Sequence, residues 1–356
     1  MHDRLAVIVF NLGGPDRPSA VEPFLFNLFN DKAIIGVPSI LRRRLASLLA
    51  RRRAKVAAHI YAQLGGASPL LPLTIDQANA LETLLVERDH EARVFVCMRY
   101  WHPMAEEVAR DVADFAARRI VLLPLYPQFS TTTTASAFDA WSVAAERAGI
   151  SNTSAIVCCY PMLAGLADAM AREITRTLDD GGLDGRYRLL FSAHGLPKRV
   201  IARGDPYQGH VEQTTAQVVE RLSERLRRDG ADHAICYQSR VGPLKWIGPS
   251  IDEELVRAAN DRVAVVVVPV AFVSEHSETL VELDIEYRRR ADELKVPRYL
   301  RVATVGTSRE FIAGLADLVE TAAAPTDPGA VRIVAQCGDS CAKVFAGCGV
   351  RRFGRS

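Results

Sequence analysis

The chain has 356 residues, more than one hydrophobic core usually covers, so two domains are expected. A composition of 49% hydrophobic and 24% charged residues is that of a folded globular protein, and a net charge of +2 gives no reason to expect nucleic acid as a partner. No signal peptide precedes the first apolar run and no apolar run reaches the roughly 18 residues of a spanning helix, so the cytoplasm is the expected location.

Strands and helices alternate along the first 150 residues. The predicted strands are 5–12, 92–98 and 120–125, and the predicted helices are 76–88 and 103–117. The first strand ends at Asn11-Leu-Gly-Gly-Pro15, where two glycines let backbone approach a ligand closely. This order predicts a doubly wound parallel sheet and an N-terminal α/β domain over 1–150.

A basic segment lies within this half, from Arg42 to Lys55, and no acidic residue occurs between Ala33 and Ile75. Four leucines fall on one helical face of it: Leu41, Leu45, Leu48 and Leu49. A basic amphipathic helix suits an anionic membrane surface or an anionic ligand. The alternative is a solvated helix packed on its leucine face, and both interpretations stay open.

The pattern restarts near Gly149. The predicted strands are 155–160, 188–191, 234–237 and 263–273, and the predicted helices are 163–178, 209–228, 251–260, 274–291 (capped by Ser274) and 311–323. The chain is thus predicted to be α/β, with two Rossmann-like doubly wound halves. The second domain is expected over 151–324, and the active site in the cleft between the carboxyl edges of the two sheets. A linker over 325–329 opens a cysteine-bearing tail, 325–356.

A histidine follows the strand at 188–191, in Ser192-Ala-His-Gly195, with Gly204-Asp-Pro-Tyr207 shortly after. The carboxyl edge of an open α/β sheet is where ligands bind. An imidazole there can accept a proton near neutral pH or coordinate a metal. A loop histidine that only bonds its own turn is the alternative for His194.

Two further groups could serve the same site. On the predicted helix after Ser274, four glutamates form an i, i+3, i+4 line that could pass protons or guide a divalent cation: Glu275, Glu278, Glu282 and Glu286. A solvated acidic face is the alternative. Aromatic and cationic residues at strand ends could hold a large flat anionic ligand: Arg99, Tyr100, Trp101, Tyr126 and Trp246.

In order along the chain, these segments resemble those of ferrochelatases, the terminal enzymes of protohaem synthesis. The matching segments are Asn11–Pro15, Arg99-Tyr100, Tyr126–Ser130, Phe191–Pro197 with Gly204–Tyr207, Gln238–Trp246, and Phe272–Leu280 with Glu282–Tyr287. The resemblance implies two Rossmann-like halves around a porphyrin cleft. It also implies a metal-chelatase lyase that inserts Fe²⁺ into protoporphyrin IX, releases two protons and gives protohaem, the last step of haem biosynthesis.

The resemblance also implies roles for single residues. His194 and Glu278 are expected to be catalytic and to bind the incoming iron, and His194 can be either the base or the first metal ligand. A proton exit is expected along Glu282 and Glu286. The expected porphyrin-binding residues are Leu12, Tyr100 and Trp246 as walls, Arg99 for a propionate, and Ser130 as a cleft residue.

Three thiols lie in the tail, in the spacing Cys337-x3-Cys341-x6-Cys348. Thiolates this close favour an iron–sulfur cluster or zinc. Some ferrochelatases carry a 2Fe–2S cluster on a similar C-terminal group, so the resemblance favours the cluster. The fourth ligand of animal members lies in the loop matching 130–134, which here has no cysteine. Cys158 is then expected to supply it, with Cys159 as the alternative; a disordered tail with incidental thiols is the third interpretation.

Other functions compete with this one. A non-catalytic haem or porphyrin carrier would need the flat pocket but not the pairing of His194 with Glu278. A serine hydrolase using Ser192 lacks the Gly-x-Ser-x-Gly elbow. A cobalt chelatase acting on an earlier tetrapyrrole would share the fold. Protoporphyrin IX and Fe²⁺ are the expected partners, with peripheral contact at the inner membrane, and both a monomer and a homodimer are compatible with the sequence.

Overall fold

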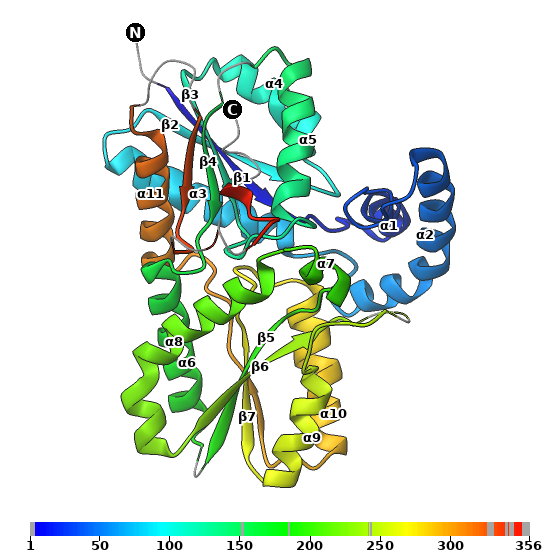
Figure 1. The fold of residues 1–356 in the computed structure, drawn as a ribbon, viewed down its shortest axis with the longest axis vertical. Coiled ribbons are helices and arrows are strands. Elements are labelled where there is room, and N and C mark those ends of the chain that lie inside the picture. Colours follow the sequence, from blue (N-terminus) through cyan, green and yellow to red (C-terminus); the bar gives the residue numbers. More distant parts are fainter. Residues whose placement is uncertain are drawn as a thin grey trace. The chain divides into compact units, whose positions relative to one another are not determined.

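The structure, a computed structural model, describes residues 4–150, 153–183, 186–240, 242, 244–325, 331–338, 341 and 345–350. The chain divides into two compact units (Figure 1). The first contains Met1–Cys159, Leu315–Ala335 and Gly349–Ser356, and the second contains Tyr160–Gly314 and Gln336–Cys348. Among the helices of the described residues, none is both long enough and apolar enough to cross a membrane.

The first unit is built on a parallel five-stranded sheet in the order β2-β1-β3-β4-β9. Its strands are β1 (Leu5–Asn11), β2 (Ala92–Met98), β3 (Arg119–Pro124), β4 (Thr153–Cys159) and β9 (Arg332–Ala335). All of β1 is buried, as expected for a parallel strand with helices on both faces. On one face, Phe10 packs edge-to-face against Phe138 and Trp141 of α5 (Thr134–Arg147).

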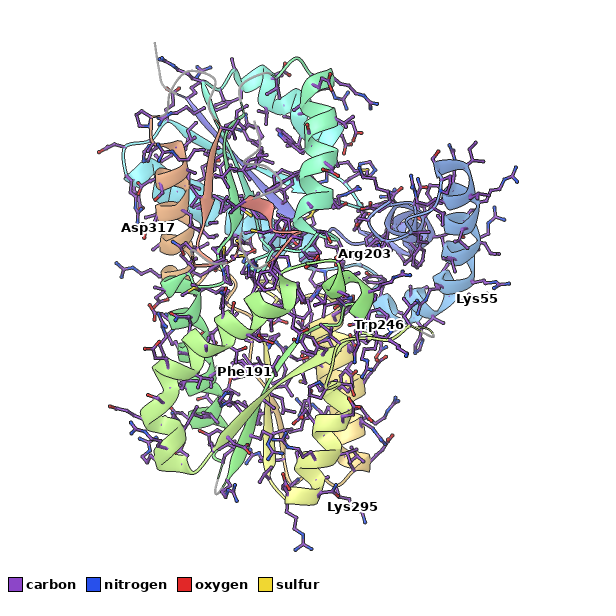
Figure 2. All side chains as sticks on the ribbon, viewed as in Figure 1. Lys55, Phe191, Arg203, Trp246, Lys295 and Asp317 are labelled. Atoms are coloured by element: carbon purple, nitrogen blue, oxygen red, sulfur yellow. The ribbon has the colours of Figure 1, made fainter. Side chains whose placement is uncertain are left out.

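Helices complete this unit. α4 (Ala105–Phe115) packs on the same face as α5, while α3 (Leu70–Glu87) contacts β2. Figure 1 draws α11 (Arg309–Ala323) on the side of the sheet opposite to α4 and α5. α1 (Val21–Phe29) and α2 (Ser39–Ala62) pack against each other, and α2 contains the predicted basic segment. The Lys55 side chain on α2 points away from the rest of this unit (Figure 2).

Contrary to the prediction from its sequence, β4 does not open the second half of the chain. β4 instead pairs with β3 on one side and with β9 on the other, so it belongs to the first sheet. β9 is a strand within the predicted tail, and the predicted linker lies outside the described residues except for Pro325. The physical reason is that an apolar strand pairs with whichever sheet edge the folded chain offers, which local periodicity does not specify.

The second unit contains a parallel four-stranded sheet in the order β6-β5-β7-β8. Its strands are β5 (Tyr187–His194), β6 (Asp232–Gln238), β7 (Ala264–Pro269) and β8 (Tyr299–Arg301). Its helices are α6 (Ala164–Gly181), α7 (Lys198–Ala202), α8 (Tyr207–Asp229), α9 (Ile251–Asp261) and α10 (Arg288–Glu293). Figure 1 shows α6 and α8 on one side of this sheet and α9 and α10 on the other. The two parallel sheets establish the predicted α/β class.

The acidic segment after β7 folds differently from the predicted helix capped by Ser274. It forms η2, a π-helix over Glu278–Tyr287, which continues into α10. Ser277 precedes η2 and makes no side-chain cap. The hydroxyl of Thr279 accepts from His276 N and donates to His276 O, so local bonds hold the preceding residues outside the helix. π-helices are rare and are frequently found at functional sites.

Candidate functional site

His194 is the last residue of β5, at the carboxyl end of the second sheet. The residues before it are fully buried, whereas 39% of the His194 side chain is exposed. β6 ends in register with it at Gln238. The structure therefore places His194 at a strand end, as the sequence predicted, on the edge where α/β sheets bind ligands.

Glu278, the first residue of η2, brings a carboxylate to this imidazole. Nδ1 of His194 lies 2.8 Å from Oε2 of Glu278. Burial lowers the pKa of His194, but the charge and the hydrogen bond of Glu278 together outweigh burial, so this pKa is raised. Burial raises the pKa of Glu278, but His194 and its other partners lower it well below its ordinary 4.5. Both shifts favour an imidazolium–carboxylate ion pair.

Two residues at the end of β6 hold the carboxylates in place. Gln238 is fully buried, and its Nε2 donates to Glu278 O at 2.9 Å and to Glu282 Oε2 at 3.0 Å. Ser239 N donates to Glu282 Oε1 at 2.8 Å. The Ser239 hydroxyl lies 3.2 Å from Glu278 Oε2 and 2.5 Å from Glu282 Oε2. One hydroxyl can therefore bond either carboxylate, a role that the sequence analysis did not assign to Ser239.

The predicted line of four glutamates is only partly present. Glu282 is half-buried, and burial together with the charge of Glu278 raises its pKa. Glu286 is exposed on the same π-helix. Glu275 does not belong to the line, because it lies before η2 and bonds Arg301 Nη1 at 2.6 Å and Thr304 N at 2.9 Å. Its part in a carboxylate line is therefore wrong, and it is part of an ion pair instead.

Trp246 lies close to the same strand end. Its backbone forms an antiparallel bridge with Pro197, and Lys198 N donates to Lys245 O at 2.8 Å. A Cβ atom at Gly195 would lie 2.9 Å from Gln238 O and 3.5 Å from Trp246 Cε3. Glycine next to His194 thus permits the close approach of β6 and of the half-buried indole.

In the first unit, the predicted site residues Arg99 and Tyr100 come directly after the end of β2. Arg99 and Tyr100 converge on Asp31, which the sequence analysis did not select: Arg99 Nη2 lies 2.9 Å and the Tyr100 hydroxyl 2.7 Å from Oδ2. The Ser136 hydroxyl donates to the same oxygen. Asp31 is buried, and its pKa is lowered because Arg99 and these hydrogen bonds outweigh the effect of burial.

Two residues predicted to bind the ligand, Tyr100 and Ser130, are almost completely buried. Tyr100 is 1% exposed, so it has no surface in this structure to serve as a wall, and we regard it as a support for Arg99. Ser130 is also 1% exposed, and its Oγ lies 2.9 Å from Thr132 Oγ1. Leu12 directly follows β1 and is half-buried.

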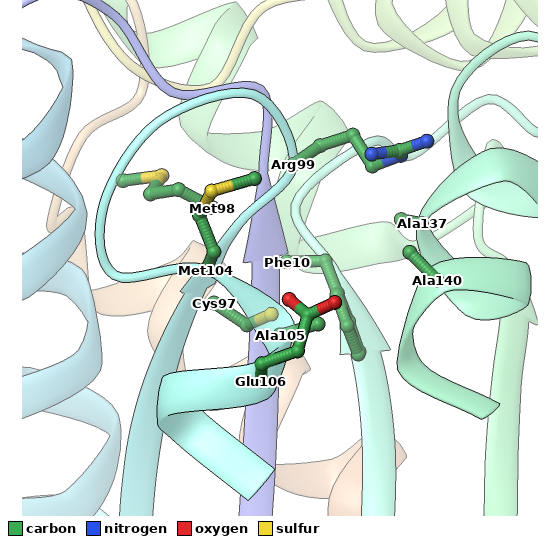
Figure 3. A pocket seen from close by; sticks show the side chains of 9 residues that line it. All are labelled: Phe10, Cys97, Met98, Arg99, Met104, Ala105, Glu106, Ala137 and Ala140. Carbon is green, nitrogen blue, oxygen red and sulfur yellow. The ribbon is translucent and has the colours of Figure 1, made fainter. Parts of the chain in front are cut away.

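A small cavity lies near Arg99 at the carboxyl ends of β1 and β2 (Figure 3). Its lining residues are Phe10, Cys97, Met98, Arg99, Met104, Ala105, Glu106, Ala137 and Ala140. Its volume of about 70 Å³ is far below the several hundred Å³ of pockets for drug-sized ligands. This cavity is therefore no site for a large flat ligand.

The three tail thiols converge within the second unit. Cys337, Cys341 and Cys348 are all buried, and the sulfurs of Cys341 and Cys348 are 3.6 Å apart. Hydrogen bonding with Cys337 and Cys348, together with burial, raises the pKa of Cys341. His210 Nε2 lies 3.2 Å from Cys341 Sγ. No sequence motif marks His210, which is 131 positions from Cys341 in the chain.

Cys158 and Cys159 end β4 and are both fully buried. The Cys158 sulfur packs beneath Gly349, where an added Cβ would collide with it and with Phe129. The register of β4 with β9 shifts between Val157 and Cys159, so Cys158 has no register partner on β9. Cys159 is in register with Ala335, and Cys337 follows two residues later.

The basic helix does not pack on its predicted leucine face. α2 buries Ala46 and Ala50, while Leu41 is 58%, Leu45 38% and Leu48 48% exposed, and Leu49 is half-buried. Exposed cations lie on the same helix, including Arg52, Arg53 and Lys55. Apolar and cationic side chains are therefore both exposed along α2.

The sequence matches known chelatases. A family model described as ferrochelatase matches residues 4–323. The ferrochelatase of Caulobacter vibrioides is 50% identical over 99% of both chains, and that of Phenylobacterium zucineum is 53% identical over 91% of this chain and 94% of that one. SirB from Bacillus subtilis, solved with Fe³⁺, has a similar fold, with a TM-score of 0.50 at 14% identity over 91% of this chain and 96% of that one.

Proposed function

This chain belongs to the ferrochelatase family, and we propose that the pair formed by His194 and Glu278 is its reaction centre. The enzyme is a metal chelatase that inserts Fe²⁺ into protoporphyrin IX, releasing two protons and giving protohaem. The observation that supports the proposed centre is the 2.8 Å contact between His194 and Glu278 at the end of β5. It joins a proton-accepting imidazole to a carboxylate at a partly exposed sheet edge.

The two side chains suit a metal that must be delivered rather than stored. Imidazole nitrogen and carboxylate oxygen are donors of intermediate and hard character, so they hold Fe²⁺ less tightly than thiolates would. Nδ1 of His194 is engaged by Glu278. Once the imidazolium has lost its Nε2 proton, the neutral ring keeps N–H at Nδ1, and the lone pair of Nε2 can accept a pyrrole proton or contact the arriving iron.

A path for the two released protons starts at the same pair. The Ser239 hydroxyl is within hydrogen-bond distance of Glu278 and Glu282, so it can accept a proton from one carboxyl group while donating its own to the other. Glu286, further along η2, is exposed to solvent. We infer the order His194, Glu278, Ser239, Glu282 and then Glu286.

We propose roles in porphyrin binding for Leu12, Arg99 and Trp246. Leu12 and Trp246 supply apolar surface, and Arg99 supplies a cation for a propionate. Asp31 balances the charge of Arg99 and orients its guanidinium, with Tyr100 and Ser136 as further supports. Ser130 has a supporting role in its loop, since its side chain is almost fully buried.

We propose a 2Fe–2S cluster on the cysteine tail. Three buried thiols, with two sulfurs 3.6 Å apart, are a donor set that fits such a cluster. The register of Cys159 with Ala335 and the packing of Cys158 under Gly349 favour Cys159 over Cys158 as the fourth ligand. The cluster would hold the tail in place, because chelation of Fe²⁺ transfers no electrons.

We also propose that α2 attaches this enzyme to the cytoplasmic face of the inner membrane. The exposed leucines and the cations of α2 support this, because they combine apolar burial with attraction to anionic lipid. Attachment would bring the enzyme to the phase where its apolar substrate dissolves.

One anaerobic assay tests the reaction and its centre. Purified protein is mixed with protoporphyrin and Fe²⁺, and absorbance follows haem formation. Turnover that disappears in Glu278→Gln supports the proposed centre. A porphyrin spectrum shifted by binding, without turnover in the unmodified protein, would indicate a carrier instead.

A further inference from the structure

His210 occupies a buried position against the cysteine tail. It lies in the first turn of α8, its side chain is fully buried, and its Nε2 is 3.2 Å from Cys341 Sγ. His210 N donates to Pro206 O at 3.0 Å, and the Thr214 hydroxyl bonds both His210 O and Pro161 O. The imidazole is thus carried by a well-anchored backbone.

The tail is in turn fitted to the start of α8. The Phe345 ring lies edge-on to the imidazole, 6.5 Å between centroids, and a Cβ atom at Gly209 would lie 2.9 Å from it. Gly347 N donates to Gly204 O at 2.9 Å. One helical turn after His210, Gln213 Nε2 donates to Cys337 O at 3.0 Å. Two side chains of α8 therefore contact the tail: His210 contacts the sulfur of Cys341, and Gln213 contacts the backbone carbonyl of Cys337.

We propose that His210 donates a hydrogen bond from Nε2 to the sulfur of Cys341 and thereby raises the reduction potential of the cluster. This inference rests on the proposed cluster. A cysteine that binds iron is a thiolate, which can only accept, so the nearby Nε2 must be the donor. Such a bond stabilises the more negative, reduced cluster more than the oxidised one, and bonds to cluster sulfurs are known determinants of potential.

The proposed role of His210 is that of a donor and not of a ligand, because the chain offers enough thiolates for the cluster. A 2Fe–2S cluster is commonly held by four thiolates, and the three tail cysteines with one cysteine of β4 provide that number. His210 is then a fifth polar group at a buried site. A buried imidazole that points at a thiolate is stable there only if it is hydrogen-bonded.

The test is a reductive titration of the full chain, purified anaerobically and reduced with dithionite. Visible absorbance and electron paramagnetic resonance follow the one-electron reduction of the cluster. His210→Phe keeps a ring but removes the donor, and His210→Gln keeps an N–H donor. Gln213→Met is the matched control, because it removes the bond to the tail backbone and leaves the bond to sulfur. Iron and acid-labile sulfide are measured for every variant.

We expect all variants to retain the cluster and His210→Phe to have a more negative midpoint potential. His210→Gln should lie between His210→Phe and the unmodified protein, and Gln213→Met should match the unmodified protein. An unchanged potential in His210→Phe overturns the proposal. So does loss of iron and sulfide in both His210 variants, or strong nitrogen hyperfine coupling in the reduced protein, since either result would make His210 a ligand. Unmodified protein without iron and sulfide would instead overturn the proposed cluster itself.

Discussion

Nδ1 of His194 lies 2.8 Å from Oε2 of Glu278, although the two residues are 84 positions apart in the chain. The contact joins the end of β5 to the start of η2. It places the imidazole of His194, which can accept a proton when it is neutral, next to the carboxylate of Glu278, which can receive that proton from it.

His194→Ala should lower the rate of Fe²⁺ insertion by at least about 100-fold, the lower end of the range for a lost acid–base residue. The fold should persist, because the side chain is partly exposed and carries little packing. Anaerobic turnover and thermal unfolding are the measurements. Near-normal turnover in a folded variant would contradict the assigned centre.

Ser239→Ala should lower kcat by roughly tenfold, the kinetic equivalent of losing one hydrogen bond of about 1.4 kcal/mol. The substitution removes the hydroxyl between Glu278 and Glu282 but keeps the backbone bond to Glu282. Turnover and its solvent isotope effect are measured. Ser223→Ala, at an exposed position of α8, is the control, and equal effects of the two changes would exclude the hydroxyl from the proton path.

Asp31→Asn should destabilise the protein by about 3 kcal/mol near neutral pH, because Arg99 loses its buried counter-charge. The pKa of Asp31 is depressed in the folded state. Its contribution is therefore present above its unfolded pKa, ordinarily 3.8, and is lost as the pH falls through the lower folded value. Denaturant unfolding of both proteins from neutral to acid pH should show the difference shrinking only below about pH 4. A difference that does not depend on pH would contradict this account.

Charge reversal of Arg52 and Arg53 to Glu should weaken binding to anionic vesicles by more than tenfold. Each cation near such a surface contributes about 1 kcal/mol. Vesicle flotation with anionic and neutral lipid is the measurement. Reversal of Arg227 and Arg228, another exposed pair of arginines, is the matched control on α8. Equal flotation of the unmodified protein with both lipids would remove the membrane proposal.

Cys341→Ser should abolish the reddish colour and the dithionite-bleachable absorption of anaerobically purified protein, because the variant lacks one cluster thiolate. Cys159→Ser should do the same, and Cys158→Ser should not. The reverse result for these two neighbours would assign the fourth ligand to Cys158, as the sequence first indicated. Stoichiometric zinc without sulfide would replace the cluster by a structural zinc site.

Local pattern was enough to predict the α/β class, the strand-end place of His194 and the family. Alternating apolar runs mark buried parallel strands, and the motif segments are short and contiguous. The apolar runs and the motif segments each consist of residues that are close together in the chain, so they can be recognised without knowledge of any long-range contact.

The tertiary structure decided what depends on distant partners. The choice of β3 and β9 as partners of β4 is made by backbone hydrogen bonds between sheet edges, which an apolar run does not specify. The π-helix moved Glu275 out of the carboxylate line and onto Arg301. Asp31, Ser239 and His210 acquire their roles only through side chains far along the chain. Because such contacts form only when separate elements pack together, no stretch of this sequence contains them by itself.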